Sequence, residues 1–361
     1  MRFISPFLKK VLYPSLSAAG VFRRTSAPGL AVVTYHGVLP PGYEPVDAAF
    51  DGNLVTAESL GQQLRLLKAH YSVISPEEAL AWRHGTFKLP PRAVLLTCDD
   101  GLLNHLTDML PVLREENARC LFFVTGASAA EARGTLWYED LFLLFLRAPA
   151  GKLEVSSGGV EICAELSSRE QRRAVWWDAV KRLSQIDAQS RRAFLRTASE
   201  QLGENLTQNI ANAVSSSCRR FGLMTLPELR SVADAGMTIG AHTLSHPMLS
   251  QMPAELADVE ITECKTKLEA ALQKPIWAFA YPFGDPASVT PQVLALAKEA
   301  GYSAAFLNYG GGLGSELPPW ALPRIHVTSE MTLAELEAHV SGFHARLQHR
   351  VGRSSPALGA A

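Results

Sequence analysis

Hydrophobic positions along the chain follow two periods in turn. Short apolar runs predict strands near residues 29–38, 71–74, 94–98, 118–124, 237–239, 276–284, 302–306 and 321–327. Between them, apolar residues recur at helical spacing near residues 56–70, 106–115, 225–235, 254–272, 291–300 and 333–347. Strands that alternate with helices predict a parallel sheet or barrel of the α/β class. In such folds the residues that follow the strands lie together at one end of the sheet, where the chemistry takes place.

Residues between Gly126 and Gly222 interrupt this alternation. The stretch from Ser168 to Gly203 is rich in Arg, Ala, Gln, Glu and Leu, which predicts helices. Two interpretations of this insertion stay open, a self-packed addition at the barrel edge and a lid or partner surface. The expected organisation is an N-terminal segment (1–28), a first part of the barrel (29–127), a mainly helical insertion (128–222), a second part of the barrel (223–348) and a disordered tail (349–361).

The composition is that of a globular protein with a sizeable core. Of the 361 residues, 47% are hydrophobic and 19% are charged, which argues against wholesale disorder. The formal net charge of -1 gives no general attraction to nucleic acid, and no such partner is expected. The five cysteines are scattered, odd in number and without a C-x-x-C pair, which is typical of reduced thiols in a cytoplasmic protein.

The N-terminal segment contains Lys9 and Lys10, followed by a mildly apolar stretch. Pro14 and several serines interrupt that stretch, whereas a secretory signal has a continuous apolar region. No window approaches about 18 uninterrupted apolar residues, so no membrane span is expected. Two interpretations stay open: the segment packs on the protein's own surface, or it is amphipathic and touches a membrane. The expected localisation is cytoplasmic, with membrane association as the alternative.

Two adjacent carboxylates, Asp99 and Asp100, follow an apolar run and precede Gly101. Carboxylates at the end of a buried strand are costly unless a positive group meets them. On a continued strand they would point to opposite sides, but a turn at Gly101 brings both to one rim. The alternative is a local role, in which an aspartate caps the following helix.

Two histidines, His242 and His246, follow the apolar run at 237–239. Pro247 disfavours helical geometry at His246, so both histidines are expected on the loop after the strand. One carboxylate and two neutral imidazoles form a three-ligand set with open positions, the usual layout of a catalytic divalent-metal site. The second carboxylate is then free to act as a base on water. Together the two motifs predict a metal-dependent hydrolase.

These motifs resemble the first two signature motifs of the polysaccharide deacetylases, carbohydrate esterases that share the homology domain of the nodulation chitooligosaccharide deacetylases. The segments that carry the resemblance are Thr97-Cys98-Asp99-Asp100-Gly101 and His242-Thr243-Leu244-Ser245-His246, with weaker likeness at Tyr35–Val38, at residues 53–75 and at Phe279–Gly284. The resemblance covers about residues 29–127 and 222–345. It implies a distorted (β/α) barrel, with residues 128–222 as an addition.

The resemblance also implies roles for individual residues. Asp100, His242 and His246 would hold a zinc-type divalent ion, and Asp99 would be the general base that takes the proton of the attacking water. The backbone N–H of Phe283 would stabilise the tetrahedral oxyanion together with the ion. An acid must then protonate the departing amine, because an amide anion is too poor a leaving group.

The sequence departs from the family pattern at several positions. Cys98 stands where phenylalanine is usual, which should change packing more than chemistry. Ala280 stands where many members have an arginine that orients the base, and our hypothesis is that Arg324 supplies this guanidinium. The acid is typically a histidine late in the chain, and His326 is the nearest candidate, although its spacing from the preceding leucine is one residue longer. His36 is the alternative acid or a substrate contact, and a core position for His326 also stays open.

The sequence therefore predicts a hydrolase that removes N-acetyl groups from an amino-sugar polysaccharide, oligosaccharide or glycan precursor. One alternative is hydrolysis of another amide, in a peptidoglycan or a small cyclic amide. The other is a non-catalytic carbohydrate-binding relative, which the missing third-motif arginine favours and the intact Asp99 disfavours. The expected partner is an N-acetylated glycan, and without a secretory signal a cytoplasmic or membrane-adjacent precursor is favoured over an exported polymer. The sequence specifies neither the sugar nor the oligomeric state.

Overall fold

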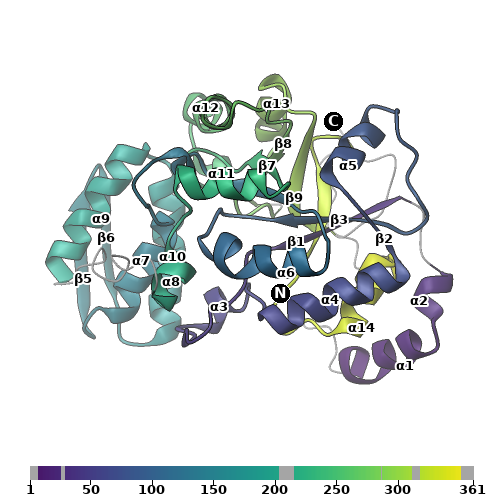
Figure 1. Ribbon diagram of the computed structural model, residues 1–361. Helices are drawn as coiled ribbons and strands as arrows, with labels where there is room; N and C mark the ends of the chain where they lie inside the picture. The colour runs from purple at the N-terminus through teal and green to yellow at the C-terminus, as the bar shows by residue number, and fades with distance from the viewer. Residues whose placement is uncertain (1–6, 26–28, 203–214, 286, 311–317, 351–361) are drawn as a thin grey trace.

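A closed barrel of seven parallel strands lies at the centre of the protein (Figure 1). The computed structural model describes residues 7–25, 29–202, 215–285, 287–310 and 318–350. In ring order the strands are β1 (Leu30–Tyr35), β10 (Leu322–His326), β9 (Ala304–Gly310), β8 (Ala278–Ala280), β7 (Thr238–Ala241), β4 (Leu121–Val124) and β3 (Ala93–Cys98), and β3 pairs with β1 to close the ring. The predicted α/β barrel is confirmed.

The barrel is distorted next to β3. β4 pairs with β3 only at Thr97 and Cys98, and a short strand, β2 (Ser72–Ile74), pairs with residues 93–95 of β3 instead. β1 and β3 are buried at every position, as expected for parallel strands that are covered on both faces. Because all the strands run in the same direction, their carboxyl ends meet at one rim.

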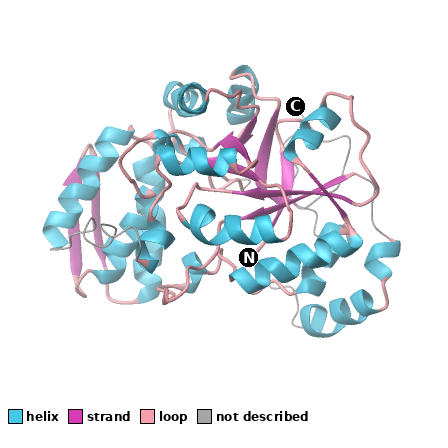
Figure 2. Ribbon diagram, viewed as in Figure 1, coloured by secondary structure: helices cyan, strands magenta, loops and turns pink. Residues whose placement is uncertain are grey.

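Helices surround the barrel strands (Figure 2). They are α4 (Ala57–His70), α5 (Pro76–Arg83), α6 (Leu110–Glu115) with the π-helical turn His105–Met109 before it, α11 (Leu226–Asp234), α12 (Ala254–Leu272), α13 (Pro291–Glu299), α14 (Leu333–Val340) and α15 (Phe343–Arg350). Two short 3-10 turns lie at Gly126–Ala129 and Leu249–Gln251, and α3 spans Ala48–Asp51. Hydroxyl side chains cap several of these helices. Ser75, for example, accepts from the backbone N–H of Glu78, whose carboxylate accepts in return from Ser75 N–H.

A second hydrophobic core lies beside the barrel, within the predicted insertion (Figure 1, left). Its elements are α7 (Trp137–Arg147), β5 (Lys152–Ser157), β6 (Val160–Glu165), α8 (Arg169–Ser184) and α9 (Ala188–Leu202), and α10 (Ser216–Phe221) leads back to the barrel. β5 and β6 form an antiparallel hairpin that the sequence prediction did not include. The bounds of the insertion, 128–222, stay a prediction.

The N-terminal segment packs on the last two helices. It consists of the π-helical turn Leu8–Leu12, α1 (Tyr13–Ala18) and α2 (Val21–Arg24). Tyr13 and Phe22 are fully buried in a cluster with Ala338 of α14, and Arg23 pairs with Glu337 at 2.6 Å. Described residues of this segment therefore pack on the protein's own surface, and its contact with a membrane stays a prediction. Among the described residues, no helix has the length and apolarity that crossing a bilayer requires. The predicted disordered tail lies outside the described residues from 351 onward.

Candidate active site

Asp99 and Asp100 follow the carboxyl end of β3. The backbone turns there because Asp100 and Gly101 both have positive φ, 86° and 81°. A positive φ is uncommon for a residue other than glycine and is often found at functional sites. Both carboxylates are buried, yet both line one cavity of about 250 Å³ at the rim of the barrel. The turn therefore directs two charged side chains into the same cavity.

Asp100, His242 and His246 form a compact group of metal-ligand side chains. Asp100 Oδ1 lies 3.6 Å from His242 Nε2 and 3.3 Å from His246 Nε2, and one ligand atom of each residue lies within 4.8 Å of the others. No other such group occurs in the part of the chain that the structure describes. Burial alone would raise the pKa of Asp100, but its contacts with the two histidines outweigh this and hold the pKa well below its usual range. Burial lowers the pKa of His246, so the group combines an ionised carboxylate with a neutral imidazole, the states in which both bind metals.

The histidine loop is held from several sides. His242 follows β7, and its Nδ1 lies 2.7 Å from the carbonyl oxygen of Ala280, so Nε2 is the atom that faces Asp100. His246 and Thr243 have positive φ, 57° and 63°, which agrees with the predicted loop rather than a helix. The orientation of His242 matches that of metal-binding histidines, which donate their other ring N–H to a carbonyl or carboxylate.

Side chains of the insertion also support this loop. Trp137 of α7 donates from Nε1 to the carbonyl oxygen of His246 at 3.1 Å. Glu260 of α12 accepts from the backbone N–H of Ser245 at 2.8 Å, and Arg191 of α9 lies 3.2 Å from the same carboxylate. Arg191 and Glu260 are both buried, so this ion pair joins the insertion to the loop between the two histidines.

Arg324 lies behind Asp99 and pairs with both of its oxygens. The distances are 2.6 Å from Nη1 to Oδ1 and 2.5 Å from Nη2 to Oδ2, and Nε donates to the carbonyl oxygen of Leu307 at 2.7 Å. Arg324 comes from β10, two strands around the barrel from Ala280 on β8. The guanidinium therefore lies where the hypothesis requires it. Burial raises the pKa of Asp99, but Arg324 and His242 more than offset this and the pKa is lowered.

His326 and His36 lie together in the cavity wall. Their ring centroids are 4.7 Å apart, and both residues line the cavity. Within the described residues, His326 Nε2 and His36 Nδ1 have no hydrogen-bond partner although both are buried. Burial, together with the neighbouring His36, lowers the pKa of His326 to about 3. Both histidines therefore face the cavity, and the choice of acid between them stays open.

Phe283 closes the cavity beside the histidine loop. Its φ is 62°, and its ring centroid lies 5.1 Å from that of His246 and 5.6 Å from that of Tyr138. All of the residues that the sequence predicts for the site thus lie in or directly behind one cavity. Their catalytic roles stay predictions.

Four cavity residues from the insertion were not among the predicted site residues. Tyr138 and Glu139 of α7 and Trp176 and Trp177 of α8 line the cavity, with Phe50 of α3 next to them. Trp137, the neighbour of Tyr138, instead packs into the core of the insertion. The sequence pattern of the insertion does not indicate which of its side chains face the site.

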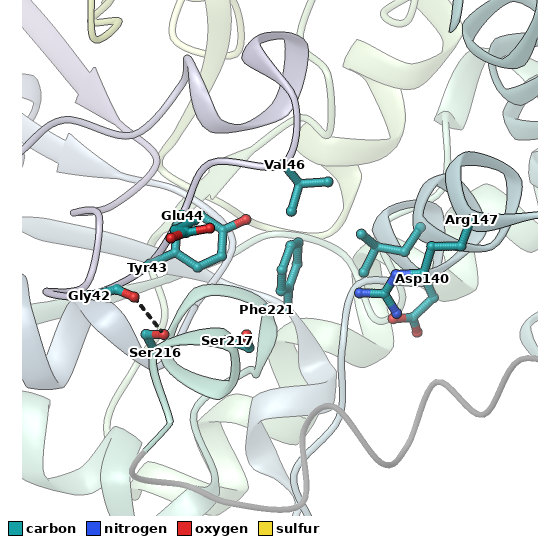
Figure 3. A pocket seen from close by; sticks show the side chains of 10 residues that line it. Gly42, Tyr43, Glu44, Val46, Asp140, Arg147, Ser216, Ser217 and Phe221 are labelled. Carbon is teal, nitrogen blue, oxygen red and sulfur yellow. Dashed lines mark hydrogen bonds between the residues drawn. The ribbon is translucent and has the colours of Figure 1, made fainter. Parts of the chain in front are cut away.

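A second cavity of about 250 Å³ is also lined in part by residues of α7 (Figure 3). Asp140 and Arg147 approach it from α7, and Tyr43 and Phe221 face it from other segments. The Asp140 carboxylate accepts a hydrogen bond from Thr135 Oγ1, and burial raises its pKa to about 6. None of the metal-ligand groups found in the described residues lies there, whereas Asp100, His242 and His246 all line the first cavity.

The histidine loop lies in the part of the chain that matches a known family. The family model described as "Polysaccharide deacetylase" matches residues 201–305, which contain both histidines and Phe283. The resemblance to the polysaccharide deacetylases is confirmed. With it, the predicted enzyme class is confirmed as a polysaccharide deacetylase-type hydrolase of amide carbon–nitrogen bonds. No curated protein matches the chain.

Several solved structures share the fold over most of the chain. The Streptococcus pyogenes deacetylase PplD, in complex with acetate, is 16% identical over 87% of this chain and 98% of that one, with a TM-score of 0.55. A de-N-acetylase from Aggregatibacter actinomycetemcomitans is 13% identical over 86% and 100%, with a TM-score of 0.54. IcaB from Ammonifex degensii is 17% identical over 88% and 98%, with a TM-score of 0.52. The similarity in fold to these structures therefore extends well before residue 201, where the family match begins.

Proposed function

We propose that this protein is a metal-dependent hydrolase that removes N-acetyl groups from an amino-sugar polysaccharide, oligosaccharide or glycan precursor. The observation that carries the proposal is the meeting of two groups in one cavity: the Asp100, His242 and His246 cluster, and Asp99 with its Arg324 pair. The family match supports hydrolysis of an amide, and the unpaired polar atoms that face the cavity support a polar ligand.

A zinc-type ion fits the three side chains. Two of the donors are imidazole nitrogens and one is a carboxylate, a set that suits zinc better than magnesium or calcium, which prefer oxygen ligands only. The orientation of His242 and the ionised state of Asp100 support the same assignment. Such an ion would polarise the acetamide carbonyl and lower the pKa of water.

The surrounding side chains supply the remaining steps. Asp99 takes the proton of the attacking water, and Arg324 holds the Asp99 carboxylate in one orientation through two hydrogen bonds. The backbone N–H of Phe283 stabilises the developing oxyanion. The bidentate contact of Arg324 with Asp99 also weighs against a non-catalytic binder. Arg324 supplies the guanidinium that orients the base, which many family members have at the position of Ala280.

His326 is expected to protonate the departing amine. At neutral pH its lowered pKa leaves it uncharged before the reaction, so it must take up a proton during turnover before it gives one to the amine. We expect His326→Ala to lower kcat on an N-acetylated sugar by about 10²–10⁴-fold. His36→Ala should lower kcat by less than about tenfold if His36 only contacts the substrate.

The leaving group distinguishes an acid from a structural histidine. An acetyl ester with a good leaving group departs without a proton, so the loss in His326→Ala should be much smaller for 4-nitrophenyl acetate than for the amide. Equal losses on both substrates would remove His326 from the acid role. A large amide-specific loss in His36→Ala would assign the role to His36.

The function itself is tested by acetate release. Zinc-loaded protein is incubated with N-acetylglucosamine oligomers and, in parallel, with an N-acetylated amine that is not a sugar. Release from the oligomers is the expected result, and release from the non-sugar amide alone would favour the other amide substrates. Sugar binding without acetate release from any substrate would establish the non-catalytic alternative. The cytoplasmic localisation, with or without membrane contact, stays a prediction.

A further inference from the structure

One wall of the active-site cavity comes from the insertion rather than from the barrel. Tyr138 and Glu139 of α7 and Trp177 of α8 line it opposite the barrel residues. The Tyr138 ring centroid lies 4.7 Å from that of His246, and Trp176 donates from Nε1 to the carbonyl oxygen of Tyr138 at 2.7 Å. The wall is therefore fixed directly against the candidate metal group.

Glu139 is the charged side chain of this wall, and half of its carboxylate is unused. It is 6% exposed, and its Oε1 lies 3.0 Å from Arg220 Nη2. Its Oε2 is buried and has no hydrogen-bond partner among the described residues. A buried carboxylate oxygen without a partner is costly, and because Glu139 lines the cavity, a ligand bound there is the natural donor to Oε2.

The ion pair with Arg220 holds Glu139 in place without neutralising the wall. Arg220 pairs with a second carboxylate, Asp51, at 2.8 Å, so two negative groups share one positive group. Asp51 is satisfied by the backbone N–H of Val46 at 2.7 Å and does not line the cavity. Asp100 and Asp140 are the other acidic groups that act on Glu139, and burial raises its pKa to about 7. Glu139 is thus the member of this cluster that lines the cavity.

We propose that Glu139 is a substrate-binding residue whose Oε2 accepts hydrogen bonds from hydroxyl groups of the sugar that carries the scissile acetamido group. Trp177 forms the apolar part of the same wall, against which the C–H face of a sugar ring packs. A sugar offers both hydroxyl donors and an apolar face, whereas a small cyclic amide offers no hydroxyl group. The inference rests on the proposed function and adds a basis for its substrate selectivity. Residues of the insertion bind the sugar ring that carries the acetamido group.

The decisive variant is Glu139→Gln, which keeps the shape of the side chain and removes the charge that the carboxylate carries above its pKa of about 7, so both proteins are assayed at about pH 8. We expect KM for an N-acetylglucosamine oligomer to rise about tenfold or more, because hydrogen bonds to charged groups are among the strongest. Since Glu139 contacts the sugar and not the reacting atoms, kcat should stay within about threefold. Zinc content, measured on the same samples, should not change.

Asp51→Asn is the matched control, because it also removes one carboxylate from Arg220 but leaves the cavity wall intact. Its KM should stay within about twofold of the parent value. An equal rise of KM in both variants would reduce Glu139 to a structural partner of Arg220 and overturn the proposal. An unchanged KM in Glu139→Gln would overturn it as well.

A second variant covers the case in which Glu139→Gln fails to fold. Trp177 is only half-buried, and Trp177→Leu should raise KM about three- to tenfold through the loss of ring contact. If the wild-type protein releases no acetate, the proposed function fails, but calorimetry with an N-acetylglucosamine oligomer, which then stays intact, still tests whether Glu139 and Trp177 contribute to sugar binding. Binding that weakens at least fivefold in Glu139→Gln or Trp177→Leu supports the inference, and equal binding by the variants and the parent overturns it.

Discussion

Replacement of Asp99 by asparagine is expected to lower kcat by about 10²–10⁴-fold. Asparagine has the same shape and can still accept a hydrogen bond from Arg324, but it cannot take the proton of the attacking water. KM and zinc content should change little, because Asp99 is not one of the three proposed ligands. The measurement is acetate release by the zinc-loaded variant at saturating substrate, with the metal content determined on the same preparation.

The control for this prediction is a carboxylate in the same cavity that has no proposed role. Asp285 lines the cavity, and its Oδ1 accepts from the backbone N–H of Ala287 at 2.9 Å and of Ser288 at 2.8 Å. Asp285→Asn should keep kcat within about threefold. Turnover that survives in Asp99→Asn would show that another group is the base, whatever the control does.

The barrel was predictable because its strands are covered on both faces. Such strands become continuous apolar runs in the sequence, as β1 and β3 do, and each run ends at the rim that carries the site. The hairpin in the insertion was missed although its signal is present. Gly158 and Gly159, both with positive φ, form a two-residue turn between strands in which buried and exposed positions alternate.

The site was predictable to the extent that it depends on strand ends. Asp100, His242 and His246 each follow a barrel strand, so their convergence follows from the topology. Arg324 was proposed because the base needs a guanidinium, and β10 carries it to Asp99. Glu139 could not be predicted this way. It lies on a helix of the insertion, and how the insertion docks on the barrel depends on tertiary contacts rather than on a strand order.

Those tertiary contacts connect substrate recognition with the metal site. In the loop that carries His242 and His246, two residues, Thr243 and His246, have the left-handed backbone conformation. This conformation costs free energy and needs support from its surroundings. Part of that support is the buried pair of Arg191 and Glu260, which joins α9 to Ser245. The insertion therefore both supplies a wall of the cavity and stabilises the loop that holds two of the proposed ligands. Changes in the core of the insertion should affect the metal site from a distance.

Loss of metal from His242→Ala and from Asp100→Ala is the largest effect that we expect. The wild-type protein should hold about one zinc ion per chain after dialysis, and each variant should lose at least about 100-fold in affinity, since even changes to groups behind a ligand cost 10- to 100-fold. Metal content is measured by mass spectrometry after reconstitution, and acetate release should fall with it.

His326→Ala is the matched control for metal loss, because it removes a half-buried imidazole from the same cavity without changing the three proposed ligands. It should retain the zinc and lose activity, which separates binding of the metal from protonation of the amine. Zinc that remains in both ligand variants would place the ion elsewhere. A wild-type protein that takes up no divalent ion after reconstitution would contradict the hydrolytic mechanism and leave sugar binding as the function of this cavity.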